Sequence, residues 1–295
     1  MSRRFNIRSV NNTPKPLTEK LSAMNKVMGE IAAADEMFTG DPEAYFNVGR
    51  SALRCINVSL MAADLEPESV RTILDLPCGH GRVLRHLREA FPNVDITACD
   101  LLHDGVDYCA KTFGARPLYS DENPANIAIK ANSFDLIWVG SLLTHMRADR
   151  WRDFLRLFER SLRLGGLLIF SAHGREAFRR TAQETCDYGV GGSAKAAVLC
   201  DYQRHGFGYA NHVFSETYGH SLSRPEWVLR EVAKFLQLRV VHFGETAWDN
   251  HHDIYACRKE ASEQRDTAVP FPKLKLRTRL RRSIQSWSDW LASDH

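Results

Sequence analysis

The chain has 295 residues, of which 44% are hydrophobic and 25% are charged, and its formal net charge is +3. This length suits one large α/β domain with extensions, and the small net charge gives no reason to expect a nucleic-acid partner. No apolar run follows the basic N-terminus, and no segment approaches the roughly 18 uninterrupted apolar residues of a membrane span. We therefore expect a cytoplasmic protein.

The seven cysteines are scattered along the chain, odd in number and never spaced as CxxC. This pattern argues against both a disulfide framework and a zinc site. We expect reduced thiols, several of them in the core.

Two helices are predicted before residue 69. The second has Asp41 as a suitable N-cap and Pro42 at its first position. The first is indicated by an apolar stripe in steps of four and three that Gly40 ends; its members are Leu17, Leu21, Met24, Met28 and Ile31. We assign residues 1–68 to a helical N-terminal extension that caps the domain after it.

From residue 70 the pattern changes to short apolar runs that alternate with helical segments, as in "RTILDL", "RVLRHLREAF" and "DITACD". Apolar runs without period-two alternation are typical of strands buried on both faces, so a mostly parallel sheet with helices on both faces follows. Two successive strands, "LRVVHFG" and "HHDIYACRK", predict an antiparallel hairpin at the sheet edge, joined by "ETAWDN". The main domain covers residues 69–260, with an insertion at about 175–220.

The last segment, residues 261–295, is a basic amphipathic tail. Between residues 267 and 288 it carries six Lys or Arg residues and no acid, with apolar residues at helical spacing. Such a tail suits a peripheral membrane contact, a partner protein or a solvated C-terminus.

The stretch "ILDLPCGHGR" places a glycine turn between a strand and a helix, where free backbone N–H groups bind ligands and glycines permit close approach. Asp100 ends the next apolar run, 25 residues after Asp75, where a carboxylate can accept both hydroxyls of a ribose. A nucleoside-containing cofactor is implied. A dinucleotide fingerprint requires a third glycine where this chain has Leu84, which disfavours a bound pyrophosphate.

The segment from Asp75 to Gly81 resembles motif I of the class I S-adenosylmethionine-dependent methyltransferases, D-x-G-x-G-x-G. "FDLIWVGSLLTHM" and "LRLGGLLIFS" are similar to that family's fourth strand and its turn into the fifth. The resemblance spans roughly residues 45–258 and implies a Rossmann-like, seven-stranded, mostly parallel sheet with helices on both faces and an antiparallel last strand. "YFNVGRSAL", "PCGHGRVLR", "WVGSLLTH" and "AWDNHHDIY" resemble bacterial members associated with glycosyltransferases and surface-glycan synthesis.

The resemblance assigns the methionine end of S-adenosyl-L-methionine to the glycine loop. Asp75 is expected to orient the methionine amino group, and Arg50 to bind its carboxylate. Pro77 replaces the family's first glycine, so that position contributes only its carbonyl. The loop residues themselves are Pro77, Cys78, Gly79 and Gly81. Leu164 replaces the usual proline of the later L-x-P-G-G turn, which affects turn rigidity more than chemistry.

The nucleoside and sulfur ends fall on the next strands. By family position Asp100 holds the ribose, Leu101 packs on adenine and Asp121 accepts from the adenine amino group. Gly140 and Ser141 border the sulfur. The alternative roles are a helix N-terminal charge for Asp75, a turn residue for Asp121 and a surface cation for Arg50.

Methyl transfer needs alignment and exclusion of water, but an alcohol acceptor must also lose a proton. His145 and His173 follow strand ends that border the same crevice, so they are the preferred catalytic candidates. Other candidates are His220 and the group His251, His252 and Asp253. This group could instead hold a metal, although its spacing matches no ligand pattern and we assign no metal.

The predicted function is transfer of a methyl group to a small-molecule or glycan acceptor, most readily at oxygen. Alternatives are a non-catalytic nucleoside-binding regulatory subunit, a nicotinamide oxidoreductase or a nucleic-acid methyltransferase. Because the chain lacks the Pro-Pro-aromatic turn of many base methylases, no DNA partner is expected. The aromatic residues of the insertion are compatible with stacking on a sugar or an aromatic ring: Tyr188, Tyr202, Phe207 and Tyr209.

Overall fold

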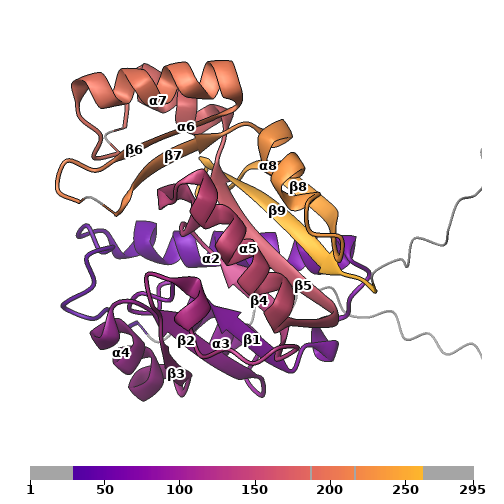
Figure 1. Cartoon of the computed structure of the whole chain (residues 1–295). Helices are drawn as coiled ribbons and strands as arrows, with labels where there is room; N and C mark the ends of the chain where they lie inside the picture. Colours follow the sequence, from indigo (N-terminus) through magenta and orange to yellow (C-terminus); the bar gives the residue numbers. More distant parts are fainter. Residues whose placement is uncertain (1–28, 187, 216, 262–295) are drawn as a thin grey trace, which may run out of the picture. The chain divides into compact units, whose positions relative to one another are not determined.

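The computed structural model describes residues 29–186, 188–215 and 217–261. Its central feature is a seven-stranded sheet with the strand order β3-β2-β1-β4-β5-β9-β8 (Figure 1). The strands are β1 (Thr72–Asp75), β2 (Asp95–Asp100), β3 (Arg116–Tyr119), β4 (Phe134–Val139), β5 (Leu162–His173), β8 (Leu238–Trp248) and β9 (His252–Lys259).

Strands β1 to β5 pair in parallel, whereas β9 runs antiparallel to both of its neighbours, β5 and β8. The predicted fold class is therefore confirmed: a Rossmann-like, mostly parallel sheet with one antiparallel strand. β9 enters the sheet between β5 and β8, so the terminal hairpin supplies both an inner and an edge strand.

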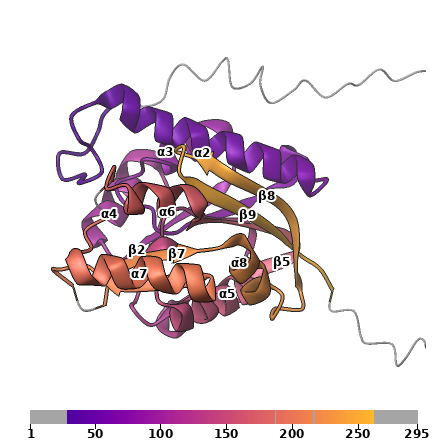
Figure 2. The same ribbon diagram turned by 90° about the horizontal axis from the view of Figure 1, so that it is seen from above.

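Helices cover both faces of the sheet. Figure 2 shows α2 on one side and α5 and α8 on the other. The helices are α2 (Pro42–Ala62), α3 (Leu84–Ala90), α4 (His103–Phe113), α5 (Ala148–Ser161), α6 (Arg175–Ala182), α7 (Gly192–His205) and α8 (Pro225–Val232). Short 3-10 turns are η1 (Pro67–Ser69), η2 (Pro124–Asn126) and η3 (Leu143–His145).

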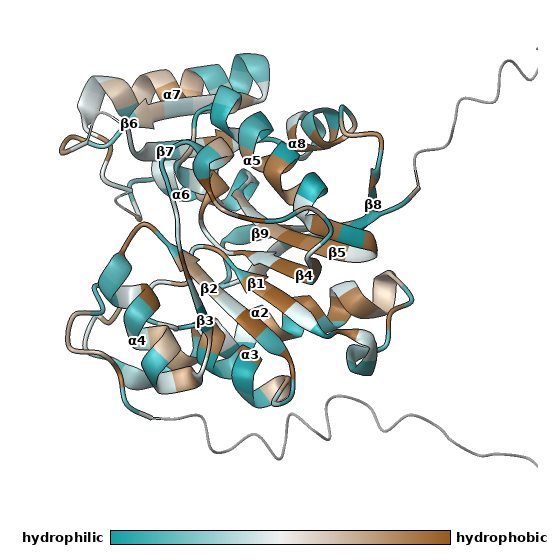
Figure 3. Ribbon diagram, turned by 60° about the horizontal axis from the view of Figure 1, so that its bottom comes forward, coloured by the Kyte–Doolittle hydropathy of each residue, from teal (hydrophilic) through white to brown (hydrophobic). Residues whose placement is uncertain are grey.

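Successive residues of the central strands point to opposite faces, and both faces are buried. Leu136 and Trp138 of β4 join the core shared with α2, α3 and α4, while Ile137 and Val139 join the core shared with α5 and α8. Burial on both sides explains the continuous apolar runs, which appear brown along β1, β4 and β5 in Figure 3.

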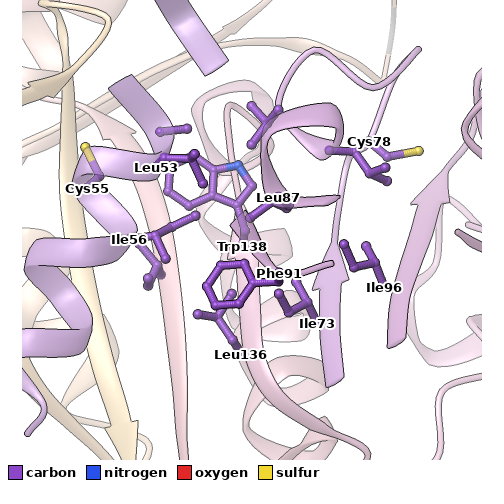
Figure 4. Packing of buried hydrophobic residues seen from close by; sticks show 14 of the residues in the cluster. Leu53, Cys55, Ile56, Ile73, Cys78, Leu87, Phe91, Ile96, Leu136 and Trp138 are labelled. Carbon is purple, nitrogen blue, oxygen red and sulfur yellow. The ribbon is translucent and has the colours of Figure 1, made fainter. Parts of the chain in front are cut away.

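Trp138 lies at the centre of the first core, among Leu53, Ile56 and Leu87 (Figure 4). Only 1% of its surface is exposed, and its ring packs edge-on against Trp248 at 5.3 Å. The indole of Trp248 in turn donates to the carbonyl of Val48 in α2, at 3.1 Å. The last hairpin is thereby joined to α2 across the core.

The start of α2 agrees with its predicted cap, because the Asp41 side chain accepts hydrogen bonds from the amides of Glu43 and Ala44. Most of the first predicted helix and almost all of the basic tail lie outside the described residues. Within the described residues, no helix combines the length and apolar character needed to cross a bilayer.

Two segments differ from prediction. β8 continues to Trp248, so its connection to β9 is only residues 249–251 and not the whole of "ETAWDN". A strand with one face toward solvent needs no continuous apolar run, and β8 alternates in burial along much of its length. The insertion contains α6, α7 and a second, two-stranded sheet of β6 (Phe207–Asn211) and β7 (Gly219–Ser223).

Candidate active site

The carboxyl ends of β1, β2, β4 and β5 carry the predicted site residues. Because these strands are parallel neighbours, Asp75, Asp100 and His173 end at one edge of the sheet, with Ser141 just past the end of β4. Ligands of open α/β sheets bind at this edge. The fold thus gathers both halves of the predicted site, the cofactor residues and the histidines.

Asp100 fixes the glycine loop from the neighbouring strand. Its Oδ2 accepts a hydrogen bond from the Gly79 amide at 2.7 Å, and its Oδ1 accepts one from the Leu102 amide at 3.0 Å. The Cys78 amide donates to the Cys99 carbonyl at 3.0 Å, which joins loop and strand again. Each carboxylate oxygen keeps further acceptor capacity, which two ribose hydroxyls can use.

The two glycines of the loop have different reasons to be glycine. Gly79 has φ +50° and open space around the position of a Cβ, as the close approach of a ligand requires. Gly81 has φ +84°, and a Cβ there would lie 2.5 Å from the Phe113 ring. Gly105 of α4, which sequence reasoning missed, packs against the loop so closely that a Cβ would meet the Gly79 carbonyl oxygen at 2.6 Å.

Asp75 is fully buried, and neither carboxylate oxygen has a partner among the described residues. Burial raises its pKa well above the usual range, and the nearby charge of Asp100 adds to this. A buried carboxylate without a partner is costly unless an amine or a water satisfies it. The methionine amino group of S-adenosylmethionine would do so, and this loop therefore fits the expected cofactor.

Two arginines are candidates to bind the methionine carboxylate of the expected cofactor. Arg50 lies on α2, where it is paired with Glu43 and Asn47 of the same helix. Arg82 directly follows Gly81, is partly buried, and its charge faces Asp249, Tyr45 and Asp35. Burial lowers the pKa of Arg82, and the nearby Asp249 opposes that shift. The role of Arg50 stays a prediction, and Arg82 is the alternative that the structure adds.

The remaining predicted cofactor residues occupy the loops after β2, β3 and β4. Leu101 is exposed, as an apolar surface for adenine should be before binding. Asp121 accepts from the Asn123 amide at 2.7 Å, which is the turn role weighed against adenine recognition. A Cβ on Gly140 would lie 2.8 Å from the ring of Trp248, so packing alone requires glycine there.

Ser141 and His145 meet at the end of β4. Ser141 has φ +60°, its amide donates to the Ser171 hydroxyl at 2.8 Å, and its own Oγ lies 3.4 Å from His145 Nε2. His145 Nδ1 lies 2.7 Å from the carbonyl oxygen of Gly219 in β7. Since a carbonyl can only accept, Nδ1 carries the proton and Nε2 keeps its lone pair.

Around His145 lies a group of rings that we call the histidine cluster. Its members come from the β4 and β5 ends, the second sheet and the terminal hairpin: His145, His173, His212, His220, His251 and His252. Tyr218 stacks on His145 at 4.4 Å, and Tyr188 stacks on His220 at 4.3 Å. The cluster thus unites every histidine candidate predicted from the sequence and adds His212.

Antiparallel pairing explains how the cluster forms. The first residue of β9 opposes the last residue of β5, so His252 pairs with His173 at the carboxyl edge of the sheet. The β6–β7 hairpin contributes His220, and His212 just outside it bonds to the Tyr218 carbonyl. His212 was missed because no apolar pattern indicated this hairpin, whose strands are short and contain glycine.

Burial keeps four of these histidines, His145, His173, His220 and His252, uncharged by lowering their pKa values. It lowers the pKa of His145 to about 4 and that of His220 to about 3, and neighbouring histidines push both in the same direction. The pKa values of His173 and His252 are shifted well below the usual range, again through burial first and nearby histidines second. At neutral pH these imidazoles offer lone pairs to protons or metals.

The aromatic residues expected to stack on an acceptor divide into two groups. Tyr202 is only 3% exposed and stacks on Phe178, and Phe207 stacks on Trp227 at 4.2 Å. Tyr202 belongs to the core of the insertion, so its predicted availability to an acceptor was wrong, whereas Phe207 packs against the core of the main domain. Tyr188 lies in the histidine cluster.

Comparison with known proteins found a family model that matches part of the chain. Residues 73–166, which include the glycine loop and Asp100, match the family model described as "Methyltransferase domain". No curated protein matches the chain.

Several solved structures share the fold at low sequence identity. The PH0226 protein of Pyrococcus horikoshii OT3 is 13% identical, with a TM-score of 0.50, over 78% of this chain and 100% of that chain. An S-adenosylmethionine-dependent methyltransferase of Clostridium acetobutylicum ATCC 824 is 15% identical, with a TM-score of 0.48, over 72% and 92%. The N-methyltransferase NodS of Bradyrhizobium japonicum WM9, solved with S-adenosyl-L-homocysteine, is 15% identical, with a TM-score of 0.46, over 83% and 99%.

Proposed function

We propose that this chain is a class I methyltransferase that uses S-adenosylmethionine, and that it transfers the methyl group to an oxygen of a small-molecule or glycan acceptor. The observation that carries the choice of oxygen is the position of His145, whose free Nε2 lies beside Ser141, where the family places the sulfur. An oxygen nucleophile needs such a proton acceptor.

In the proposed reaction, a lone pair of the acceptor oxygen forms a bond to the methyl carbon, and the electrons of the carbon–sulfur bond go to sulfur. The sulfonium thereby becomes the neutral thioether of S-adenosylhomocysteine. The hydroxyl proton moves to His145 Nε2 and from there to solvent. Although the pKa of His145 is only about 4, it suffices, because an oxygen that gains a methyl group becomes strongly acidic.

The protein's contribution is mainly alignment. Asp100 and Gly79 hold the nucleoside end, while the Gly219 carbonyl fixes the ring of His145 toward the acceptor side. The insertion supplies Gly219 to this region, and exclusion of water from the transfer strengthens alignment. The glycan class of acceptor rests on the four sequence segments similar to glycan-associated methyltransferases.

The test is a product-release assay for S-adenosylhomocysteine with pooled glycan, small-phenol and peptide acceptors, followed by mass and NMR analysis of the methylated product. We expect an O-methyl ether. The variant His145→Asn keeps a donor for the Gly219 carbonyl but lacks the lone pair, so turnover should fall about 100-fold with unchanged S-adenosylhomocysteine binding.

The matched control is His205→Asn, which replaces an exposed histidine at the end of α7 and should keep full turnover. A methyl group found on nitrogen, or wild-type turnover in His145→Asn, would contradict the proposal.

A further inference from the structure

We propose that His173, His251 and His252 bind one divalent transition-metal ion of the zinc type, and that this ion holds the acceptor oxygen beside His145. The three side chains each offer one imidazole nitrogen, and these nitrogens all lie within 4.8 Å of one another. The metal part stands on the geometry alone, whereas the acceptor part rests on the proposed O-methyl transfer.

The backbone brings the three rings together. His173 and His252 are paired across β5 and β9, with ring centroids 4.5 Å apart. His251 precedes His252 in the tight turn, and its ring lies 4.2 Å from that of His252 and 5.6 Å from that of His173. Two ligands on paired strands and one in the adjoining turn form a rigid base with one adjustable member.

The buried nitrogens lack partners. His173 is 3% exposed with no hydrogen-bond partner at either nitrogen among the described residues, and His252 is 5% exposed with none at Nδ1. Leaving such groups unsatisfied destabilises the folded state, so a native structure normally supplies a ligand or water. A metal ion would satisfy one nitrogen on each ring.

His251 shows the arrangement of a metal ligand. Its Nδ1 lies 2.7 Å from the carbonyl oxygen of Asp249, so Nδ1 is protonated and Nε2 is free to coordinate. A backbone carbonyl that fixes the tautomer of a ligating histidine is a usual feature of metal sites. His251 is also the least buried of the three. A small movement of its side chain can bring its nitrogen closer to those of the other two histidines, toward the about 3.3 Å between ligand nitrogens in a tetrahedral zinc site.

The donor set selects the ion. Three neutral imidazoles suit Zn²⁺, Co²⁺, Ni²⁺ or Fe²⁺, and they do not suit Mg²⁺ or Ca²⁺, which prefer oxygen ligands. Asp253 is buried next to His252, and its Oδ2 has no partner among the described residues. Asp249 adds a second negative charge near the site, whereas Arg82 adds a positive charge. Three protein ligands leave an open coordination position, as in catalytic zinc sites.

The open position lies near the proposed base, because the rings of His173 and His145 are 6.4 Å apart. A hydroxyl bound to the metal has a lowered pKa, so its proton passes more readily to His145 and its oxygen attacks as a stronger nucleophile. Dependence on the metal would therefore appear in turnover and in acceptor binding, while cofactor binding would be unchanged.

The experiment is a titration of the chelator-treated full chain with Zn²⁺ by calorimetry, and with Co²⁺ by visible absorption. We expect one equivalent of Zn²⁺ with a micromolar or tighter Kd, and an intense Co²⁺ spectrum of tetrahedral type. The variants His251→Ala and His173→Ala should each weaken Zn²⁺ binding at least tenfold, and His205→Ala, which removes an exposed histidine of α7, should leave it unchanged.

Binding of S-adenosylhomocysteine reports whether each variant is folded. If His173→Ala does not fold, His251→Ala decides the test, because His251 is the less buried of the two residues. Absence of stoichiometric Zn²⁺ binding in the wild type, or wild-type Zn²⁺ affinity in both variants, overturns the site. Zn²⁺ binding without any rise in turnover overturns the acceptor role. Identification of the methylated atom is a separate readout, so O-methylation by a metal-free enzyme would reject the metal and keep the proposed function.

Discussion

The carboxylate of Asp100 accepts a hydrogen bond from the backbone amide of Gly79, with 2.7 Å between Oδ2 and N. The residue at the end of β2 that is predicted to bind the ribose therefore also holds the glycine loop. The same edge of the sheet places the buried Asp75 carboxylate within electrostatic reach of Asp100. If Asp100 binds the ribose as predicted, cofactor binding and loop geometry are linked through this one side chain.

Asp100→Ala should weaken S-adenosylhomocysteine binding about 100-fold in calorimetry. The variant loses hydrogen bonds donated to a charged carboxylate, each of which contributes about 1.5–3 kcal/mol, together with the anchor of Gly79. Asp95→Ala at the other end of the same strand is the control, because Asp95 is exposed and forms an ion pair with Arg116 at the surface. Equal binding by the two variants would remove Asp100 from the site.

Arg82 and Arg50 can be separated with two ligands. 5′-Methylthioadenosine has the nucleoside and sulfur of the cofactor but no amino-acid carboxylate. We expect Arg82→Met to raise the Kd of S-adenosylhomocysteine about tenfold and to leave that of methylthioadenosine unchanged, because only the former needs the cation. If Arg50→Met shows this selectivity and Arg82→Met does not, Arg50 is the carboxylate partner.

Alanine should mainly weaken cofactor binding at Gly79 and mainly lower the stability of the fold at Gly81. Gly79→Ala faces open space, so it should cost about 1 kcal/mol of stability through its positive φ while strongly weakening cofactor binding. Gly81→Ala drives a methyl group into Phe113 and should cost about 2–4 kcal/mol. Denaturant unfolding and calorimetry measure the two quantities; a larger stability loss in Gly79→Ala would contradict this assignment.

His86 should make the protein less stable in mild acid. It is fully buried in α3, and burial, followed by the charges of Arg85 and Arg50, lowers its pKa to about 4. Between the unfolded value of about 6.5 and pH 4 only the unfolded state binds the proton, so stability falls as pH falls, by up to about 1.4 kcal/mol per pH unit.

Thermal or urea unfolding of His86→Leu between pH 7.5 and 4.5 should therefore show a shallower loss of stability than the wild type. His205→Leu, at an exposed position, should retain the wild-type slope. Parallel slopes for wild type and His86→Leu would show that His86 is not proton-linked to folding.

Much of the fold and of the cofactor loop could be predicted from the sequence because both are recorded locally. Apolar runs buried on two faces identify β1, β4 and β5, and the cap at Asp41 marks the start of α2. The glycine loop and Asp100 lie within one strand–turn–helix–strand segment, so their spacing along the chain already indicates a nucleoside site. The sequence alone also indicated five of the six histidines of the histidine cluster as catalytic candidates.

Only the tertiary structure decided how those histidines act. His145, His173, His220 and His252 come from four separate elements, and their meeting depends on the register of β9 against β5 and on the position of β7 beside η3. Such pairings are long-range and leave no periodic signal in the sequence. Neighbours that are distant in the chain also determine the burial of these residues and the tautomer of His145, which the Gly219 carbonyl selects. The same holds for the distinction between Arg50 and Arg82. Each of these is an effect of the surroundings of a residue and not of its type.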